Sequence, residues 1–188
     1  HVHAETIGHS VEGRSIDMLT ITDETVPDAD KRVILIGAVQ HAGEDCGAYL
    51  VEGLAYFLIS DDPVAIDSRK RFIYKLIPMI NPDGIFHGIS RYNANMQDLN
   101  TEWDDDSSDP ANAPVEPEVA AIKQWTEAWL AANNRIDLCL DFHSHSQQIQ
   151  YNSIHSPAPG VLFNFTEILN HYWPLKWQLT ENSAGRMR

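Results

Sequence analysis

The stretch Arg32-Val-Ile-Leu-Ile-Gly-Ala-Val-Gln-His-Ala-Gly-Glu44 decides the fold. Its first part, residues 32–39, is rich in β-branched and aliphatic side chains, which is typical of a strand buried on both faces. Gly43 permits a tight turn of the backbone, and apolar residues at helical spacing follow from Glu44 onward. The stretch therefore predicts a buried strand that ends in a polar loop, with His41 in the loop and a helix after it.

The rest of the chain alternates between strand-like and helix-like segments. Strands that alternate with helices predict an α/β domain with three layers, α/β/α, around a mixed and mostly parallel sheet. No repeat or linker divides the sequence, so we expect residues 1–188 to form a single domain. The histidines among the first nine residues are expected in a mobile or surface segment. The expected strands are 15–22, 32–39, 71–79, 136–142 and 148–152, and the expected helices are 44–60, 116–133 and 160–172.

The 188-residue chain carries a formal net charge of −14, and this acidity narrows the range of partners. We expect neither nucleic acid nor an anionic membrane as a partner, because both would repel the protein. No apolar run approaches the roughly 18–20 residues of a membrane span, and no signal peptide precedes the predicted fold. The sequence therefore predicts a soluble protein, with the cytoplasm slightly favoured. The acidic tract 104–109 is expected to be a solvated loop rather than a calcium site.

Three polar side chains follow the ends of two predicted strands. His41 and Glu44 come after the first of these strands, and His143 comes directly after the second. Because ligands gather at the carboxyl ends of strands in α/β sheets, the three can converge at one edge. Two imidazoles and one carboxylate are the ligand set of an open, catalytic zinc site. For any single histidine the alternative is a structural residue held by hydrogen bonds. His145 is expected to be exposed or to support the ligands from outside.

Seven short motifs lie along the chain in a fixed order. They are Ile7-Gly-His-Ser-Val-Glu-Gly-Arg14, His41-Ala-Gly-Glu44, Asn81-Pro-Asp-Gly84 (expected as a turn), Arg91-Tyr-Asn-Ala-Asn95, Asp98-Leu-Asn100, Glu116-Pro-Glu118 and Phe142-His-Ser144. Their order and spacing resemble those of the zinc metallocarboxypeptidase family, the carboxypeptidase A-like peptidases. Each motif alone is weak, but the ordered set covers nearly the whole chain. Residues 91–100 are more similar to short bacterial and cytosolic members than to pancreatic ones.

The resemblance implies a role for each matching residue. His41, Glu44 and His143 would bind one zinc ion. Asp98 would accept a hydrogen bond from the ring of His41 and fix its orientation, the alternative being an aspartate that caps a turn. Arg91 would polarise the scissile carbonyl and hold the developing oxyanion, the alternative being a surface salt bridge.

Two features depart from the pattern of the family. The resemblance implies that Asn100 helps to bind the terminal carboxylate of the substrate, but Thr101 follows it where the family has an arginine. Threonine supplies no charge, which leaves open another cation, a different end group or weak peptide binding. The second departure is the catalytic glutamate, which is not identifiable. Glu167 and Glu181 are available carboxylates, but neither stands in a matching context.

These departures shape the expected function. The chain is expected to be an incomplete version of a longer catalytic domain that lacks its last strands, the alternative being a naturally shortened, inactive relative. A sheet that ended here would expose an edge that a partner or a second copy could cover. The expected activity is zinc-dependent hydrolysis of a peptide, with release of the C-terminal residue by a metal-activated water. Two alternatives stay open: an amide hydrolase of the same fold with a non-peptide or modified substrate, and a zinc-binding module without catalysis.

Overall fold

The computed structural model of the chain describes residues 1–103 and 115–144. Several expectations lie outside these residues, namely the acidic loop 104–109, the strand 148–152, the helix 160–172, and the placement of His145, Glu167 and Glu181. The single domain over residues 1–188 also stays a prediction. The described residues contain the strands and helices that carry the candidate site.

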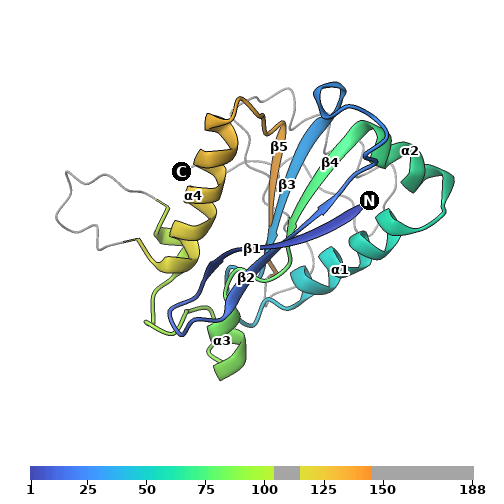
Figure 1. Cartoon of the computed structure of the whole chain (residues 1–188). Helices are drawn as coiled ribbons and strands as arrows, with labels where there is room; N and C mark the ends of the chain where they lie inside the picture. The colour runs from blue at the N-terminus through green and yellow to red at the C-terminus, as the bar shows by residue number, and fades with distance from the viewer. Residues whose placement is uncertain (104–114, 145–188) are drawn as a thin grey trace, which may run out of the picture. The chain divides into compact units, whose positions relative to one another are not determined.

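One mixed sheet forms the centre of the described residues, with the strand order β1-β2-β4-β3-β5 (Figure 1). The central strand β3 pairs in parallel with both β4 and β5. The other two pairings, β1 with β2 and β2 with β4, are antiparallel. The expected mixed sheet is therefore confirmed, although parallel and antiparallel pairings are equal in number among the described strands rather than mostly parallel. The strands are β1 (Val2–His9), β2 (Ser15–Ile21), β3 (Arg32–Ala38), β4 (Phe72–Ile77) and β5 (Leu138–Phe142).

Helices cover both faces of this sheet. Figure 1 shows α4 (Pro117–Ala131) on one side, with α1 (Cys46–Ile59) and α2 (Pro63–Arg71) on the other. Two separate apolar clusters follow from this arrangement. Leu35 packs in the cluster with Ile122 of α4, whereas its neighbour Ile36 packs in the cluster with Val51 of α1. Successive residues of β3 thus face opposite layers, which confirms the three-layer α/β/α architecture.

Three elements differ from the sequence-based expectations. The histidines of the N-terminal segment are at the surface as expected, but the segment also forms the strand β1, which was not predicted and which pairs with β2. The polar helix α2 was not expected. The motif at 81–84 is not a simple turn but the start of a short helix, α3 (Pro82–His87). The Asn81 side chain caps α3 by accepting a hydrogen bond from the backbone of Gly84 at 2.9 Å. Two short 3-10 helices, Asp28–Asp30 and Leu99–Thr101, complete the described elements.

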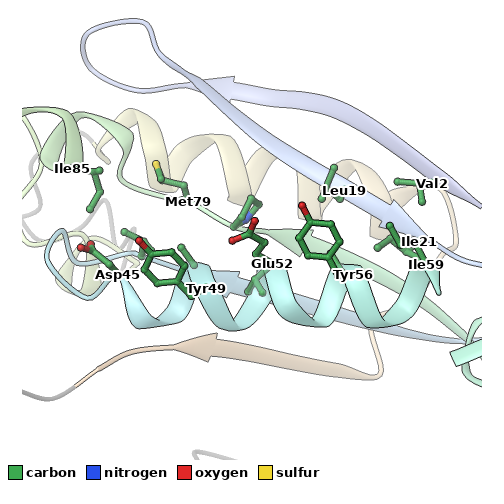
Figure 2. Close-up of a pocket in the computed structure, with 15 residues that line it drawn as sticks. Val2, Leu19, Ile21, Asp45, Tyr49, Glu52, Tyr56, Ile59, Met79 and Ile85 are labelled. Carbon is green, nitrogen blue, oxygen red and sulfur yellow. The ribbon is translucent and has the colours of Figure 1, made fainter. Parts of the chain in front are cut away.

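An apolar cavity of about 610 Å³ lies between α1 and the β1–β2 side of the sheet. Figure 2 shows Tyr56 of α1 beside Leu19 and Ile21 of β2, and Tyr49 of α1 opposite Met79. Neither histidine nor the glutamate of the candidate zinc site lines this cavity. Within the described residues, the helices are all too short or too polar to cross a bilayer.

Candidate metal centre

The carboxyl ends of two neighbouring parallel strands bring His41 and His143 together. Ala38, the last residue of β3, pairs with Phe142, the last residue of β5. His143 follows directly, and His41 lies three residues beyond β3, where its side chain is only 4% exposed. Val39, the first residue after β3, adopts a positive φ of 54°. That conformation is costly for a β-branched residue, and such strain is typical of functional sites.

Glu44 completes the group from the turn that leads into α1. Gly43 has a φ of 88°, so the tight turn expected before Glu44 is present. One ligand atom from each of His41, Glu44 and His143 can be chosen so that all lie within 4.8 Å of one another. Nδ1 of His41 lies 3.2 Å from Nδ1 of His143 and 3.2 Å from Oε1 of Glu44. The Oε2 atom of Glu44 lies 2.9 Å from Nδ1 of His143.

The outer ring nitrogens of both histidines contact carboxylates. Nε2 of His41 lies 3.0 Å from Oδ1 of Asp98, and Nε2 of His143 lies 2.7 Å from Oδ2 of Asp141. An ionised carboxylate only accepts hydrogen bonds, so a neutral ring that offers Nδ1 to a metal keeps its proton on the Nε2 that faces Asp98 or Asp141. In the neutral rings, both Nδ1 atoms then present lone pairs toward each other and toward Glu44. Electron pairs that converge in this way call for a cation between them.

The spacing of the donor atoms fits a small tetrahedral cation. Two ligands at about 2.1 Å from a zinc ion, at tetrahedral angles, lie roughly 3.4 Å apart. The two Nδ1 atoms lie 3.2 Å apart. Glu44 places Oε1 at 3.2 Å from Nδ1 of His41 and its other oxygen, Oε2, at 2.9 Å from Nδ1 of His143. Their nitrogen and oxygen donors are also those that zinc prefers, and three protein ligands leave a position for water or substrate. The arrangement is a candidate metal site with an open position.

Asp98 joins the candidate metal site to Arg91. Its Oδ2 atom accepts a hydrogen bond from Nε of Arg91 at 2.7 Å and lies 2.6 Å from Nη2 of the same side chain, while its Oδ1 atom contacts His41. Burial raises the pKa of the Asp98 carboxyl, but its hydrogen bonds, led by that from Arg91, outweigh burial and hold the pKa below the usual range. Asp98 therefore stays ionised at neutral pH. The contact expected between Asp98 and His41 is present, and Arg91 is engaged in an ion pair.

Asp141 contacts Nε2 of His143 as Asp98 contacts Nε2 of His41. Asp141 was not predicted from the sequence. The hydrogen bond with Asp141 raises the pKa of His143 although burial acts in the opposite direction. Asp141 stands two residues before His143, so the two side chains leave the strand on the same face. That spacing is the signal in the sequence that could have identified Asp141.

The loop that carries Arg91 is fixed by buried polar contacts. The backbone N–H of Arg91, which has a φ of 73°, donates to the carbonyl of Ala42 at 2.7 Å. Asn93 donates from Nδ2 to Glu116 at 2.7 Å and to Glu118 at 3.2 Å. Burial raises the pKa of the Glu118 carboxyl above its ordinary value. The motif at 116–118 therefore braces the loop rather than lying among the candidate metal ligands.

Asn100 and Thr101 lie beside Asp98 in the 3-10 helix. The backbone N–H of Asn100 donates to Oδ1 of Asp98 at 3.1 Å, the same oxygen that contacts His41. The Asn100 side chain accepts a hydrogen bond from Nε2 of Gln40 at 2.8 Å. The Thr101 hydroxyl turns back and donates to the backbone oxygen of Asp98 at 2.8 Å. Asn100 thus lies at the candidate site, and Thr101 adds no charge there.

Comparison with known proteins gives a consistent result. A model of the zinc carboxypeptidase family matches residues 1–178. Human cytosolic carboxypeptidase 6 is 32% identical over 145 residues, which are 76% of this chain and 28% of that protein. Cytosolic carboxypeptidase 1 from Danio rerio is 33% identical over 153 residues, which are 77% of this chain and 12% of that protein. The chain therefore spans less than a third of the length of these relatives.

Two solved structures are similar over nearly all of this chain. A metallo-carboxypeptidase from Burkholderia cenocepacia has a TM-score of 0.74 and 28% identity, and the match covers 97% of this chain and 50% of that one. A metallo-carboxypeptidase from Pseudomonas aeruginosa, in complex with (2-guanidinoethylmercapto)succinic acid, has a TM-score of 0.69 and 27% identity. That match covers 98% of this chain and 48% of the other.

Proposed function

Because the chain belongs to the zinc carboxypeptidase family, we propose that it binds one zinc ion and hydrolyses peptides with release of the C-terminal residue. His41, Glu44 and His143 are the proposed ligands. The observation that carries the proposal is the convergence of their donor atoms, with both outer ring nitrogens bonded to carboxylates. That arrangement supports a resident cation, and the nature of the donors favours zinc.

Each polar residue around the ligands has a proposed task. A bound zinc ion would supply an activated water and polarise the scissile carbonyl. Asp98 and Asp141 hold the two imidazoles with their lone pairs toward the metal. Arg91 meets Asp98 through the Nε–Nη2 edge of its guanidinium. We expect its Nη1 edge to meet the oxyanion that forms from the carbonyl, which a permanently charged group stabilises.

The proton acceptor for the attacking water is not assigned to a residue within 1–103 or 115–144. A protein without this base would bind zinc and substrate without turnover, and would then be a zinc-binding module without catalysis. The localisation and any partner along an exposed edge of the sheet also stay predictions. The similar curated proteins are named cytosolic carboxypeptidases, and this name supports the cytoplasm as the place to look for the protein.

Thr101 favours a second candidate function, hydrolysis of a non-peptide or modified amide. The Thr101 hydroxyl donates to the backbone oxygen of Asp98, and the side chain has no positive charge that could bind the free carboxylate of a peptide. A substrate with a neutral end group would lose less from this change than a peptide with a free C-terminus. The two functions therefore differ in the end group that the protein accepts.

A hydrolysis assay separates the candidates. The zinc-loaded chain would be incubated with N-acetyl tripeptides that end in Phe, Lys or Glu, each as the free acid and as the C-terminal amide. Release of the last amino acid from the free acids only would support the carboxypeptidase, and turnover of the amides would support the amide hydrolase. Bound zinc with no turnover of either series would favour the binding module. An Arg91→Ala variant serves as the control for hydrolysis by contaminants.

A further inference from the structure

A chain of directed hydrogen bonds runs from Trp103 through Gln40 to Asn100. Nε1 of Trp103 donates to Oε1 of Gln40 at 3.0 Å, and Nε2 of Gln40 donates to Oδ1 of Asn100 at 2.8 Å. Gln40 is only 1% exposed, whereas Asn100 is exposed. The chain therefore begins at a partly exposed indole, passes through a buried amide and ends at the proposed substrate-binding side chain.

The chemistry of the three groups fixes their orientation. An indole N–H can only donate, so the Gln40 atom that faces Trp103 must be the amide oxygen. The Gln40 amide nitrogen then points at Asn100, and the Asn100 atom that accepts its hydrogen bond must be the oxygen. The Nδ2 group of Asn100 remains, with no hydrogen-bond partner within residues 1–103 and 115–144. An exposed donor, rather than an acceptor, is presented at the site.

The hydrogen-bond chain from Trp103 to Asn100 is held in place at both ends, by contacts near the candidate metal centre and by a contact with α4. Gln40 directly precedes His41, and the backbone N–H of Asn100 shares Oδ1 of Asp98 with the His41 ring. At the other end, Lys123 of α4 donates to the backbone oxygen of Trp103 at 3.2 Å. The direction of the Asn100 amide is thus tied to the elements that hold the proposed metal ligands.

We propose that Gln40 and Trp103 are positioning residues that present the Asn100 Nδ2 group to the anionic end of the substrate. The proposal rests on the proposed function, in which Asn100 binds the terminal carboxylate. A free asparagine amide can rotate and offer its oxygen, which would repel a carboxylate. With Thr101 in place of a charged neighbour, the preference for a carboxylate depends on holding this one donor outward.

The test compares binding of free acids and amides, and it does not require turnover. Isothermal titration calorimetry on the zinc-loaded chain would use the N-acetyl tripeptides ending in Phe, Lys or Glu. In Trp103→Phe the ring remains but its N–H is lost. We expect this variant to bind the free acids roughly tenfold more weakly, with a much smaller effect on the amides. Trp129→Phe is the matched control, because the Trp129 indole donates to a backbone carbonyl of Arg135 away from the site.

A second variant reverses the direction of the hydrogen bond between residue 40 and Asn100. In Gln40→Glu both side-chain oxygens accept, so Asn100 must donate Nδ2 inward and present its oxygen to the substrate. We expect this variant to bind the amides more tightly than the free acids. If the buried carboxylate prevents folding, Trp103→Phe still decides the question. Zinc content, measured on every variant, is expected to equal that of the wild type.

The background variant Asn100→Ala separates positioning from general support. If Trp103 acts through Asn100, Trp103→Phe adds no further loss in this background, so the two effects are not additive. An equal loss in both backgrounds would overturn the proposal, as would unchanged binding in Trp103→Phe when Asn100→Ala weakens it. If Asn100→Ala binds acids and amides as the wild type does, the proposal is overturned as well. The zinc and hydrolysis measurements still judge the proposed function on their own.

Discussion

Oδ1 of Asp98 lies 3.0 Å from Nε2 of His41. The other ring nitrogen of His41, Nδ1, faces Glu44 and His143. This contact sets the tautomer of a proposed metal ligand from outside the metal centre. Replacing Asp98 by asparagine would let the ring reorient and would make its lone pair less basic. We expect Asp98→Asn to lower zinc affinity by roughly 10–100-fold. Competition with a chromophoric chelator measures this affinity, and Asp67→Asn, an exposed change on α2, is the matched control.

Asp141 supports His143 in the same way but in a wetter place. Its side chain is 36% exposed, compared with 17% for Asp98. Water can replace part of the contact that is lost in Asp141→Asn, so we expect a smaller fall in zinc affinity than for Asp98→Asn. The same chelator competition compares the two variants. A larger fall for Asp141→Asn would mean that exposure does not govern the strength of these two contacts.

Two glycines of α1 give opposite expectations for the same substitution. A Cβ atom on Gly47 would meet the backbone oxygen of Phe142 at 2.9 Å, whereas Gly53 has nothing within 4 Å. We expect Gly47→Ala to lower the free energy of unfolding by about 1–3 kcal/mol and to disturb the strand end before His143. Gly53→Ala should raise the free energy of unfolding by about 1 kcal/mol. Urea unfolding of both variants checks the pair, and equal effects would show that the contact at Gly47 relaxes freely.

Burial of Glu118 predicts a dependence of stability on pH. Its pKa lies above the ordinary value near 4.3, so the folded protein keeps a proton that the unfolded chain releases. The contribution of Glu118 to stability is then full in acid and is lost as pH rises through the raised pKa. We expect Glu118→Gln to gain stability relative to the wild type as pH rises from the ordinary glutamate pKa through the raised pKa of Glu118.

The control for this titration lies on the same helix. Glu127 of α4 is exposed, so Glu127→Gln is the matched surface variant over the same pH range. Urea unfolding at several pH values measures both variants. A flat difference for Glu118→Gln would contradict a raised pKa in the folded protein.

Strong local patterns in the sequence predicted most of the fold. The apolar run of β3 and the helical spacing in α1 and α4 place their elements within two residues of the observed bounds. Two of the elements that were missed, β1 and α2, bury few side chains. β1 forms through backbone pairing with β2 while its side chains stay mostly exposed, so it shows little apolar alternation. The helix α2 is polar, but Pro63 after the capping residue Asp62 was a usable signal for its start.

The proposed metal ligands could be predicted because they follow strand ends in the sequence. Contacts between residues far apart in the sequence could not be predicted in this way. His41, Glu44 and His143 stand at strand ends in the sequence, and the structure brings them together. Gln40 and Trp103 are 63 positions apart, and their contact depends on how the 3-10 helix packs beside the β3 loop. No periodicity reports such a contact. Their meeting could therefore be read only from the structure.

Zinc content is the measurement that tests the central claim most directly. The purified chain would be saturated with zinc, desalted and analysed by inductively coupled plasma mass spectrometry beside His143→Ala and the control His87→Ala. His87 is paired with Glu12 in the structure and stands outside the proposed ligand set. The account predicts one zinc per chain in the wild type and in His87→Ala, with loss of zinc in His143→Ala. A wild-type chain without zinc, or a His143→Ala chain that keeps a full equivalent, would contradict it.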